Sequence, residues 1–221
     1  DEGWFTLALQ PIVDLVTLRP IGAEALLRVD AERCEEAHSA LEIIRTAEET
    51  GQIETLGAWV LDEALRTGGD MKSLVAPGHH LSINVSGRQI NQNLLPTVRA
   101  AIERAGFPPA SLVIEITETA VISRFDKAVE ILNAVRALGA KVALDDFGVG
   151  YSSLGYLHRL PVDIIKLDRS LIQGLDASGL KSEDARRSGA LIRSIASLAN
   201  DLGIAIVAEG IETAEAAQAL K

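Results

Sequence analysis

The sequence lacks the features that mark several classes of protein. It has one cysteine, Cys34, so no disulfide can form within the chain, and this fits a reducing compartment. No apolar run approaches the roughly 18 residues that a membrane-spanning helix needs, and nothing reads as a signal peptide. We therefore expect a cytoplasmic protein, or the cytosolic part of a larger one, with no segment inserted in a membrane.

Positive charge is also scarce. Lysine and arginine together number 21 against 31 aspartates and glutamates, and the formal net charge is −10. Without a basic run, the chain is not expected to bind long nucleic acid, which requires a basic surface. A small anionic ligand is still compatible with this charge, because bound metal ions can reverse the local field.

The apolar segments predict one α/β domain over residues 1–221. The chain is 48% hydrophobic, enough for a single large core, and no stretch resembles a domain linker. Short apolar runs alternate with helical patterns, as in a mainly parallel sheet. The expected strands are 5–15, 21–29, 81–86, 112–117, 141–146, 164–168 and 205–209.

The number and spacing of these strands indicate a modified barrel. Only a short turn separates the first two strands, so we expect that pair to be antiparallel. A closed (β/α)8 barrel needs eight strands, one more than the sequence shows. We expect the eighth strand to lie beyond Lys221, so that the domain is truncated at its C-terminus; an open sheet is the alternative.

Polar side chains recur near the C-terminal ends of these strands. Because side chains alternate between faces, each strand has one apolar face and a second face that ends in a carboxylate, amide or amine. In a barrel these ends meet where active sites are built. The residues expected to converge there are Glu24, Asn84, Glu115, Asp145, Asp146, Lys166, Asp168 and Glu209.

So many carboxylates need compensating cations, since burial and mutual repulsion oppose their ionisation. Oxygen ligands suit Mg²⁺ or Mn²⁺. The neighbours Asp145 and Asp146 would point to opposite faces of a regular strand, so both reach one site only if the strand ends at Phe147-Gly148. Two close acidic ligands indicate a pair of metals, which can activate water and stabilise phosphoryl transfer.

The motifs of the chain are, in order, QPIVDL (10–15) with EALLR (24–28), NVS (84–86), EITE (115–118), DDFGVGYSSL (145–154), IIKLD (164–168) and AEGIET (208–213). They resemble the successive motifs of the EAL-domain cyclic di-GMP phosphodiesterases. The resemblance implies a modified TIM barrel with an antiparallel first strand. It also implies a bacterial signalling enzyme that hydrolyses cyclic di-GMP to linear pGpG with Mg²⁺ or Mn²⁺, two ions per site.

The resemblance also assigns the metal ligands. Glu24, Asn84, Glu115 and Asp145 would bind the first metal ion. Asp145 and Asp146 would engage the second. Glu24 is thereby also counted among the catalytic residues.

Further roles follow from the same resemblance. Lys166 would bind or activate the nucleophilic water, and Glu209 would hold the network of metal and water. Arg28 would contact a ligand phosphate. Gln10 and Asp168 are placed with Arg28 among the substrate-binding residues.

Glu118 resembles the residue that anchors the DDFG loop, which the family links to dimerisation, so a homodimer is expected. Fusion to sensory or GGDEF domains outside this chain is expected on the same ground. The sequence departs from the family at Leu9, Val29 and Val149, where tyrosine, tryptophan and threonine are frequent. The family's final glutamine motif, on the eighth strand, is absent.

Two other functions are compatible with parts of the sequence. The same fold could serve as a catalytically inactive cyclic di-GMP receptor, but the visible metal and water residues are intact, which favours catalysis. Lys166 could form a Schiff base in an aldolase-like barrel, which the ring of carboxylates disfavours.

Structural roles are the simpler alternatives for single residues. Glu24 could pair with Arg28, and Lys166 with Asp168. Asn84 could be a cap, and Asp145-Asp146 a turn. The pairs His79-His80 and Glu48-Glu49 are expected to be solvated.

Overall fold

The computed structural model describes residues 3–30, 39–71, 74, 76, 78–122, 124–148, 154–176 and 183–221. Val149, one of the departures from the family pattern, lies outside these residues, as does Cys34.

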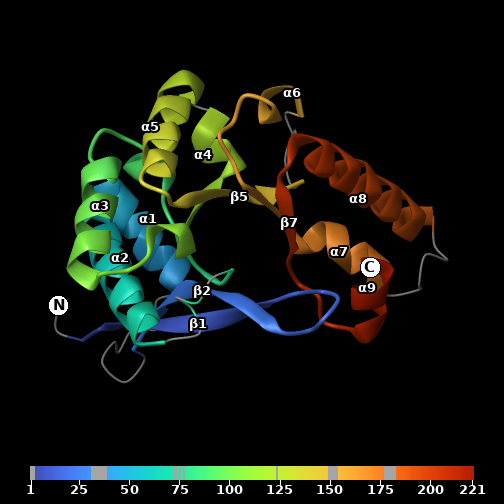
Figure 1. Ribbon diagram of the computed structural model, residues 1–221, viewed down its shortest axis with the longest axis horizontal. Coiled ribbons are helices and arrows are strands. Elements are labelled where there is room, and N and C mark those ends of the chain that lie inside the picture. The colour runs from blue at the N-terminus through green and yellow to red at the C-terminus, as the bar shows by residue number, and fades with distance from the viewer. Residues whose placement is uncertain are drawn as a thin grey trace.

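A single curled sheet of seven strands forms the centre of the fold (Figure 1). The strands lie in sequence order: β1 (Phe5–Val13), β2 (Pro20–Val29), β3 (His80–Asn84), β4 (Leu112–Thr117), β5 (Lys141–Phe147), β6 (Ile164–Leu167) and β7 (Ala205–Ala208). β1 pairs with β2 in antiparallel fashion, and every later pair is parallel. The seven predicted strands and the antiparallel first strand are therefore confirmed. In the part of the chain that the structure describes, β1 and β7 are the two edges of the sheet.

Helices cover the convex face of the sheet, with α1 to α5 at one end and α7 to α9 at the other (Figure 1). They are α1 (Ala40–Thr50), α2 (Ile53–Asp70), α3 (Leu94–Ala105), α4 (Glu118–Ile122), α5 (Phe125–Ala137), α6 (Leu154–Leu157), α7 (Arg169–Asp176), α8 (Glu183–Leu202) and α9 (Ala214–Ala219). Two short 3₁₀ turns, η1 (Gly87–Gln89) and η2 (Pro109–Ser111), complete the described elements. Local signals set the ends of α1: Ser39 and Glu42 form a capping box, and Gly51 ends the helix at φ 76°.

The two faces of the sheet have different partners. On the outer face, side chains such as Ile83, Ile114 and Leu167 are buried in the main core beneath the helices. On the inner face, a separate small cluster consists of Val113, Ala143, Ile164 and the half-buried Val207.

Each member of this inner cluster lies two residues before a polar side chain. Val113 precedes Glu115, Ala143 precedes Asp145, Ile164 precedes Lys166, and Val207 precedes Glu209. Because residues two apart share a face, the inner surface changes from apolar to polar towards the C-terminal ends of the strands. The sheet thus provides an apolar floor with a polar ring above it.

Candidate active site

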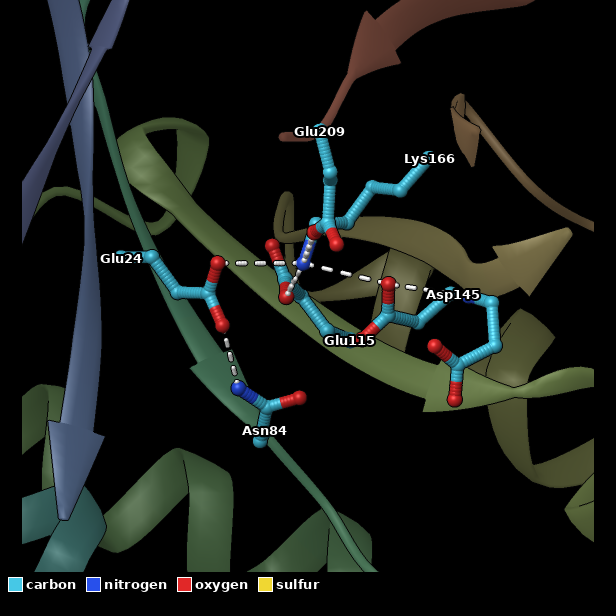
Figure 2. Close-up of polar contacts among 7 residues, drawn as sticks. Glu24, Asn84, Glu115, Asp145, Lys166 and Glu209 are labelled. Atoms are coloured by element: carbon cyan, nitrogen blue, oxygen red, sulfur yellow. Dashed lines mark hydrogen bonds and ion pairs between the residues drawn. The ribbon is translucent and has the colours of Figure 1, made fainter. Parts of the chain in front are cut away.

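Four carboxylates surround the ammonium group of Lys166 (Figure 2). Its Nζ atom lies 2.6 Å from Glu115 Oε2 and 2.7 Å from Glu209 Oε1. It lies 3.1 Å from Glu24 Oε2 and 3.2 Å from Asp145 Oδ1. These residues lie in β2, β4, β5 and β6 and directly after β7, so the polar ring predicted from strand periodicity is present.

Asn84 joins this ring from the end of β3. Its Nδ2 atom donates to Glu24 Oε1 at 2.7 Å, and its backbone pairs in register with Glu115 of β4. Two simpler alternatives from the sequence therefore do not hold: the Asn84 side chain contacts Glu24 instead of capping a helix, and Glu24 does not pair with Arg28. Arg28 instead donates from Nη1 to the carbonyl of Leu27 at 2.9 Å.

Asp145 and Asp146 lie at a β-bulge. Leu144 pairs with Ile165 and Phe147 with Leu167, so three steps along β5 match two along β6. Asp146 has φ 56°, in the left-handed region that aspartate tolerates better than most residues, and its backbone N–H donates to Asp145 Oδ1 at 3.0 Å. The strand ends at Phe147, as the Phe147-Gly148 pair predicts, but the bulge before this end was not predicted. The bulge, with the strand continuing through Phe147, is what changes the direction of Asp146.

Burial and mutual repulsion act on the acidic groups of the ring. Burial, together with the charges of Glu24 and Asp145, raises the pKa of Glu115 to about 7 despite the contact with Lys166. Burial also raises the pKa of Glu209, against the opposing hydrogen bond from Lys166. Partial burial and the charges of Asp145 and Asp168 raise the pKa of Asp146, which is still open to solvent.

Lys166 responds in the opposite sense. Burial alone would lower its pKa, but the charges of Glu115 and Asp145 outweigh burial and the pKa is raised. Lys166 is therefore an ammonium that donates hydrogen bonds. A Schiff-base lysine needs a lowered pKa, so this environment argues against the aldolase-like interpretation. The alternative of an ion pair between Lys166 and Asp168 does not describe these contacts, because Lys166 pairs with four other acids.

The charge of the ring is not balanced. One ammonium faces four carboxylates, which leaves an excess of three negative charges if all are ionised. Among the residues that the structure describes, no three acidic, histidine or cysteine side chains are arranged to hold a metal ion directly; Lys166 Nζ lies where the carboxylates converge. The donor set, carboxylate and amide oxygens with excess negative charge, fits a hard divalent cation by its chemistry.

A family model described as the EAL domain matches residues 1–221. The chain belongs to the EAL domain family.

Named relatives and solved structures resemble this EAL domain over most of its length. The cyclic di-GMP phosphodiesterase NbdA of Pseudomonas aeruginosa is 38% identical over 174 residues, which are 77% of this chain and 21% of NbdA. The MucR phosphodiesterase of the same organism, solved in complex with c-di-GMP, superposes with a TM-score of 0.87 at 33% identity, covering 99% of this chain and 86% of that one. A manganese and cy-diGMP complex of Klebsiella pneumoniae BlrP1 has a TM-score of 0.81 at 31% identity, covering 98% of this chain and 53% of that one.

This EAL domain corresponds to only part of several longer relatives. It spans 29% of an Azorhizobium caulinodans protein that is 38% identical over 98% of the domain. None of the described helices combines the length and the apolar character that crossing a membrane requires.

The substrate-binding residues predicted for the EAL domain lie around the ring. Gln10 of β1 is exposed and lies directly opposite Glu24 in the β1–β2 pair, on the same face. Arg28 is exposed near the end of β2. Asp168 follows β6, and its Oδ1 atom accepts from the backbone N–H of Ser170 at 2.8 Å, so it caps the start of α7. Hydrogen bonding to Ser170 lowers the pKa of Asp168.

Two glycines follow strands of the ring and lie against α7. Gly148 has φ 106°, and a methyl group there would overlap the Leu171 side chain. Gly210, directly after Glu209, has φ 68°, and a Cβ would lie 2.5 Å from Arg169 Cβ. Both the backbone conformation and the close approach require glycine, so α7 can pack beneath the ends of β5 and β7.

Glu118 begins α4, immediately after β4. It lines a small recess that it shares with Phe147 of the DDF segment and Tyr156 of α6. Residues 149–153 of the DDFG loop lie outside the described residues, so the anchoring role of Glu118 stays a prediction.

Two residues expected to be solvated are not. His80 begins β3 and is only 8% exposed; it lies against Gly22, and its burial lowers its pKa. Glu48 of α1 is half-buried and accepts a hydrogen bond from the Ser86 hydroxyl. Its neighbour Glu49 is exposed, as expected. No pattern in the sequence separates Glu48 from Glu49; only the position of α1 beside the end of β3 does.

Proposed function

We propose that this EAL domain is a metal-dependent phosphodiesterase that hydrolyses cyclic di-GMP to linear pGpG in the bacterial cytoplasm. The observation that carries the proposal is the ring of Glu24, Glu115, Asp145 and Glu209 around Lys166. It is built at the ends of successive strands in a domain whose relatives include named cyclic di-GMP phosphodiesterases. A relative solved with manganese and cy-diGMP supports the choice of ligand and of metal class.

Two ions of Mg²⁺ or Mn²⁺ would be held at the ring. Glu24, Asn84, Glu115 and Asp145 supply the oxygens for one, and Asp145 and Asp146 for the other. When bound, such ions activate water and stabilise the negative charge of phosphoryl transfer. They would also neutralise the excess charge that, together with the larger effect of burial, raises the pKa of Glu115 and Glu209.

The protein's own groups bind and orient the reactants. As an ammonium, Lys166 donates hydrogen bonds to the attacking water and to phosphate oxygens that gain charge. Glu209 accepts from Lys166 and fixes the direction of that donor. Water adds to one phosphorus, the bond from that phosphorus to the ribose 3′-oxygen breaks, and the released oxygen takes a proton; a linear dinucleotide with one terminal phosphate results.

Residues around the ring would hold the rest of the ligand. The guanidinium of exposed Arg28 can form paired hydrogen bonds with a phosphate. Gln10 presents an amide opposite Glu24 on the same face. Asp168, already a helix cap, would contact the ligand from the end of β6. We also expect the domain to form a homodimer through the DDFG loop, which Glu118 would anchor. Fusion to sensory or GGDEF domains is expected as well.

The test is incubation of the domain with cyclic di-GMP and Mg²⁺ or Mn²⁺, with products separated by chromatography. We expect pGpG in the presence of either metal and none after chelation. Tight binding of cyclic di-GMP without turnover, with either metal at saturation, would instead identify a catalytically inactive receptor.

A further inference from the structure

The segment that follows Asn84 is held from several directions. Asn84 is the last residue of β3, and the backbone N–H of Val85 donates to the carbonyl of Glu115 at 2.9 Å. Val85 is 5% exposed. Ser86 then starts the 3₁₀ turn η1. The position of Asn84 therefore depends on how residues 85–89 are held.

The Ser86 hydroxyl is the centre of that turn. It donates to Glu48 of α1 and accepts from the backbone N–H of Arg88 at 3.2 Å. A hydroxyl has one proton, and the Glu48 carboxylate can only accept. The proton of the Ser86 hydroxyl therefore points to Glu48, which leaves the oxygen lone pairs to accept from the backbone N–H of Arg88. In return, Gln89 Oε1 accepts from the backbone N–H of Ser86 at 3.0 Å and closes the capping box.

Close packing holds the same turn on its other sides. A methyl group at Gly57 of α2 would overlap the amide of Gln89, which is 7% exposed. A Cβ at Gly87 would lie 2.7 Å from Ala120 Cβ of α4. The turn therefore fits between α2 and α4 without space to shift, and α1 supplies a charged acceptor to it.

We propose that Glu48 is a positioning residue for the metal-binding ring. It holds Ser86, and through Val85, the one residue between Ser86 and Asn84, it holds Asn84 where its amide reaches Glu24. A carboxylate acceptor makes a stronger hydrogen bond to a hydroxyl than a neutral one. The inference rests on the proposed function, because it assumes that Asn84 is a metal ligand. Loss of a group that orients a metal ligand commonly weakens metal affinity by about 10- to 100-fold.

Mn²⁺ binding to the metal-free domain, measured by titration calorimetry, tests this without any turnover. We expect Glu48→Ala to weaken Mn²⁺ binding by about 10-fold, with the circular dichroism spectrum unchanged. Glu48→Gln, which keeps an acceptor, should restore part of the affinity. Glu49→Ala, one residue along α1 and exposed, is the matched control and should bind Mn²⁺ like the wild type. Equal affinity of Glu48→Ala and wild type would overturn the proposal, as would an equal loss in Glu49→Ala.

A second pair of variants tests the route through Ser86. If Glu48 acts on the ring through the Ser86 hydroxyl, adding Glu48→Ala to Ser86→Ala should cause no further loss of Mn²⁺ affinity. Additive losses would overturn the route.

In turnover assays, Glu48→Ala should raise the Mn²⁺ concentration that gives half-maximal rate and leave kcat at saturating Mn²⁺ nearly unchanged; an equal loss of kcat would contradict positioning. A wild-type domain that binds Mn²⁺ but makes no pGpG would refute only the proposed function, whereas one that binds no Mn²⁺ refutes both.

Discussion

The Nζ atom of Lys166 lies 2.6 Å from Glu115 Oε2, and both side chains are almost fully buried, at 3% and 1% exposure. The two residues are 51 positions apart and lie in strands that are separated by β5. An ion pair buried in this way is costly to break on one side only, since the remaining charge loses its partner. Lys166 therefore has two roles, one in the proposed chemistry and one in the stability of the metal-free site.

Removing the Lys166 amine should separate turnover from binding. In Lys166→Ala we expect kcat to fall by at least about 100-fold while the Kd for cyclic di-GMP changes less, since hydrogen bonds that strengthen in the transition state act mainly on the rate. Comparison of single-turnover rates with ligand titration measures both. Equal losses in rate and affinity would assign Lys166 to ligand binding alone.

Glu24 contacts both Asn84 and Lys166, so its removal should disable the ring without unfolding the domain. We expect Glu24→Ala to abolish detectable pGpG formation. Its thermal unfolding should stay close to that of Glu63→Ala, a control at a position where the acid pairs with Arg66 on the surface of α2. Turnover retained in Glu24→Ala would contradict the metal-binding role.

The stability of the metal-free domain should fall as pH rises. Burial raises the pKa of Glu115 to about 7, above the ordinary value of 4.5 that it has in the unfolded chain. The folded state therefore binds this proton more tightly, so the stabilisation is complete below about pH 4.5 and is lost as pH rises through 7. The raised pKa values of Asp146 and Glu209 act in the same sense.

Urea unfolding in the presence of a chelator, at pH 5.5 and pH 8, measures this effect. We expect a loss on the order of 1 kcal/mol between the two values. Glu115→Gln, which cannot ionise, should show a flatter profile. Saturating Mn²⁺ should remove the decline, because a bound cation favours the ionised acids. Equal slopes in the wild type and Glu115→Gln would contradict the assignment, because the lowered pKa of His80 acts in the opposite sense in both proteins.

Gly148 should be required for the fold around the bulge. Its φ of 106° and its contact with Leu171 both oppose a side chain, so we expect Gly148→Ala to lower the free energy of unfolding by roughly 1–3 kcal/mol. Among the residues that the structure describes, none has an atom within 4 Å of a Cβ added at Gly155 of α6, which provides the control. Gly155→Ala should be neutral or slightly stabilising in the same chemical denaturation. Similar losses in both variants would mean that neither strain nor packing distinguishes Gly148.

The sequence by itself determined the order of the strands, the antiparallel first pair and the set of polar side chains at the strand ends. These follow from local rules: a period of two along each strand, and a turn too short for a parallel connection. The period of two also explains the apolar floor and the polar ring above it. It places Val113 on the same face as Glu115, and Ile164 on the same face as Lys166.

The tertiary structure alone decided which of these groups meet. It placed Lys166 among four acids, turned Asp146 by a bulge that the sequence did not indicate, and separated half-buried Glu48 from its exposed neighbour Glu49. Each outcome depends on the distance between segments far apart in the chain, or on the register of one strand against the next. Periodicity within a segment carries no information on either, because it fixes the face on which a side chain lies but not the partner that it finds there.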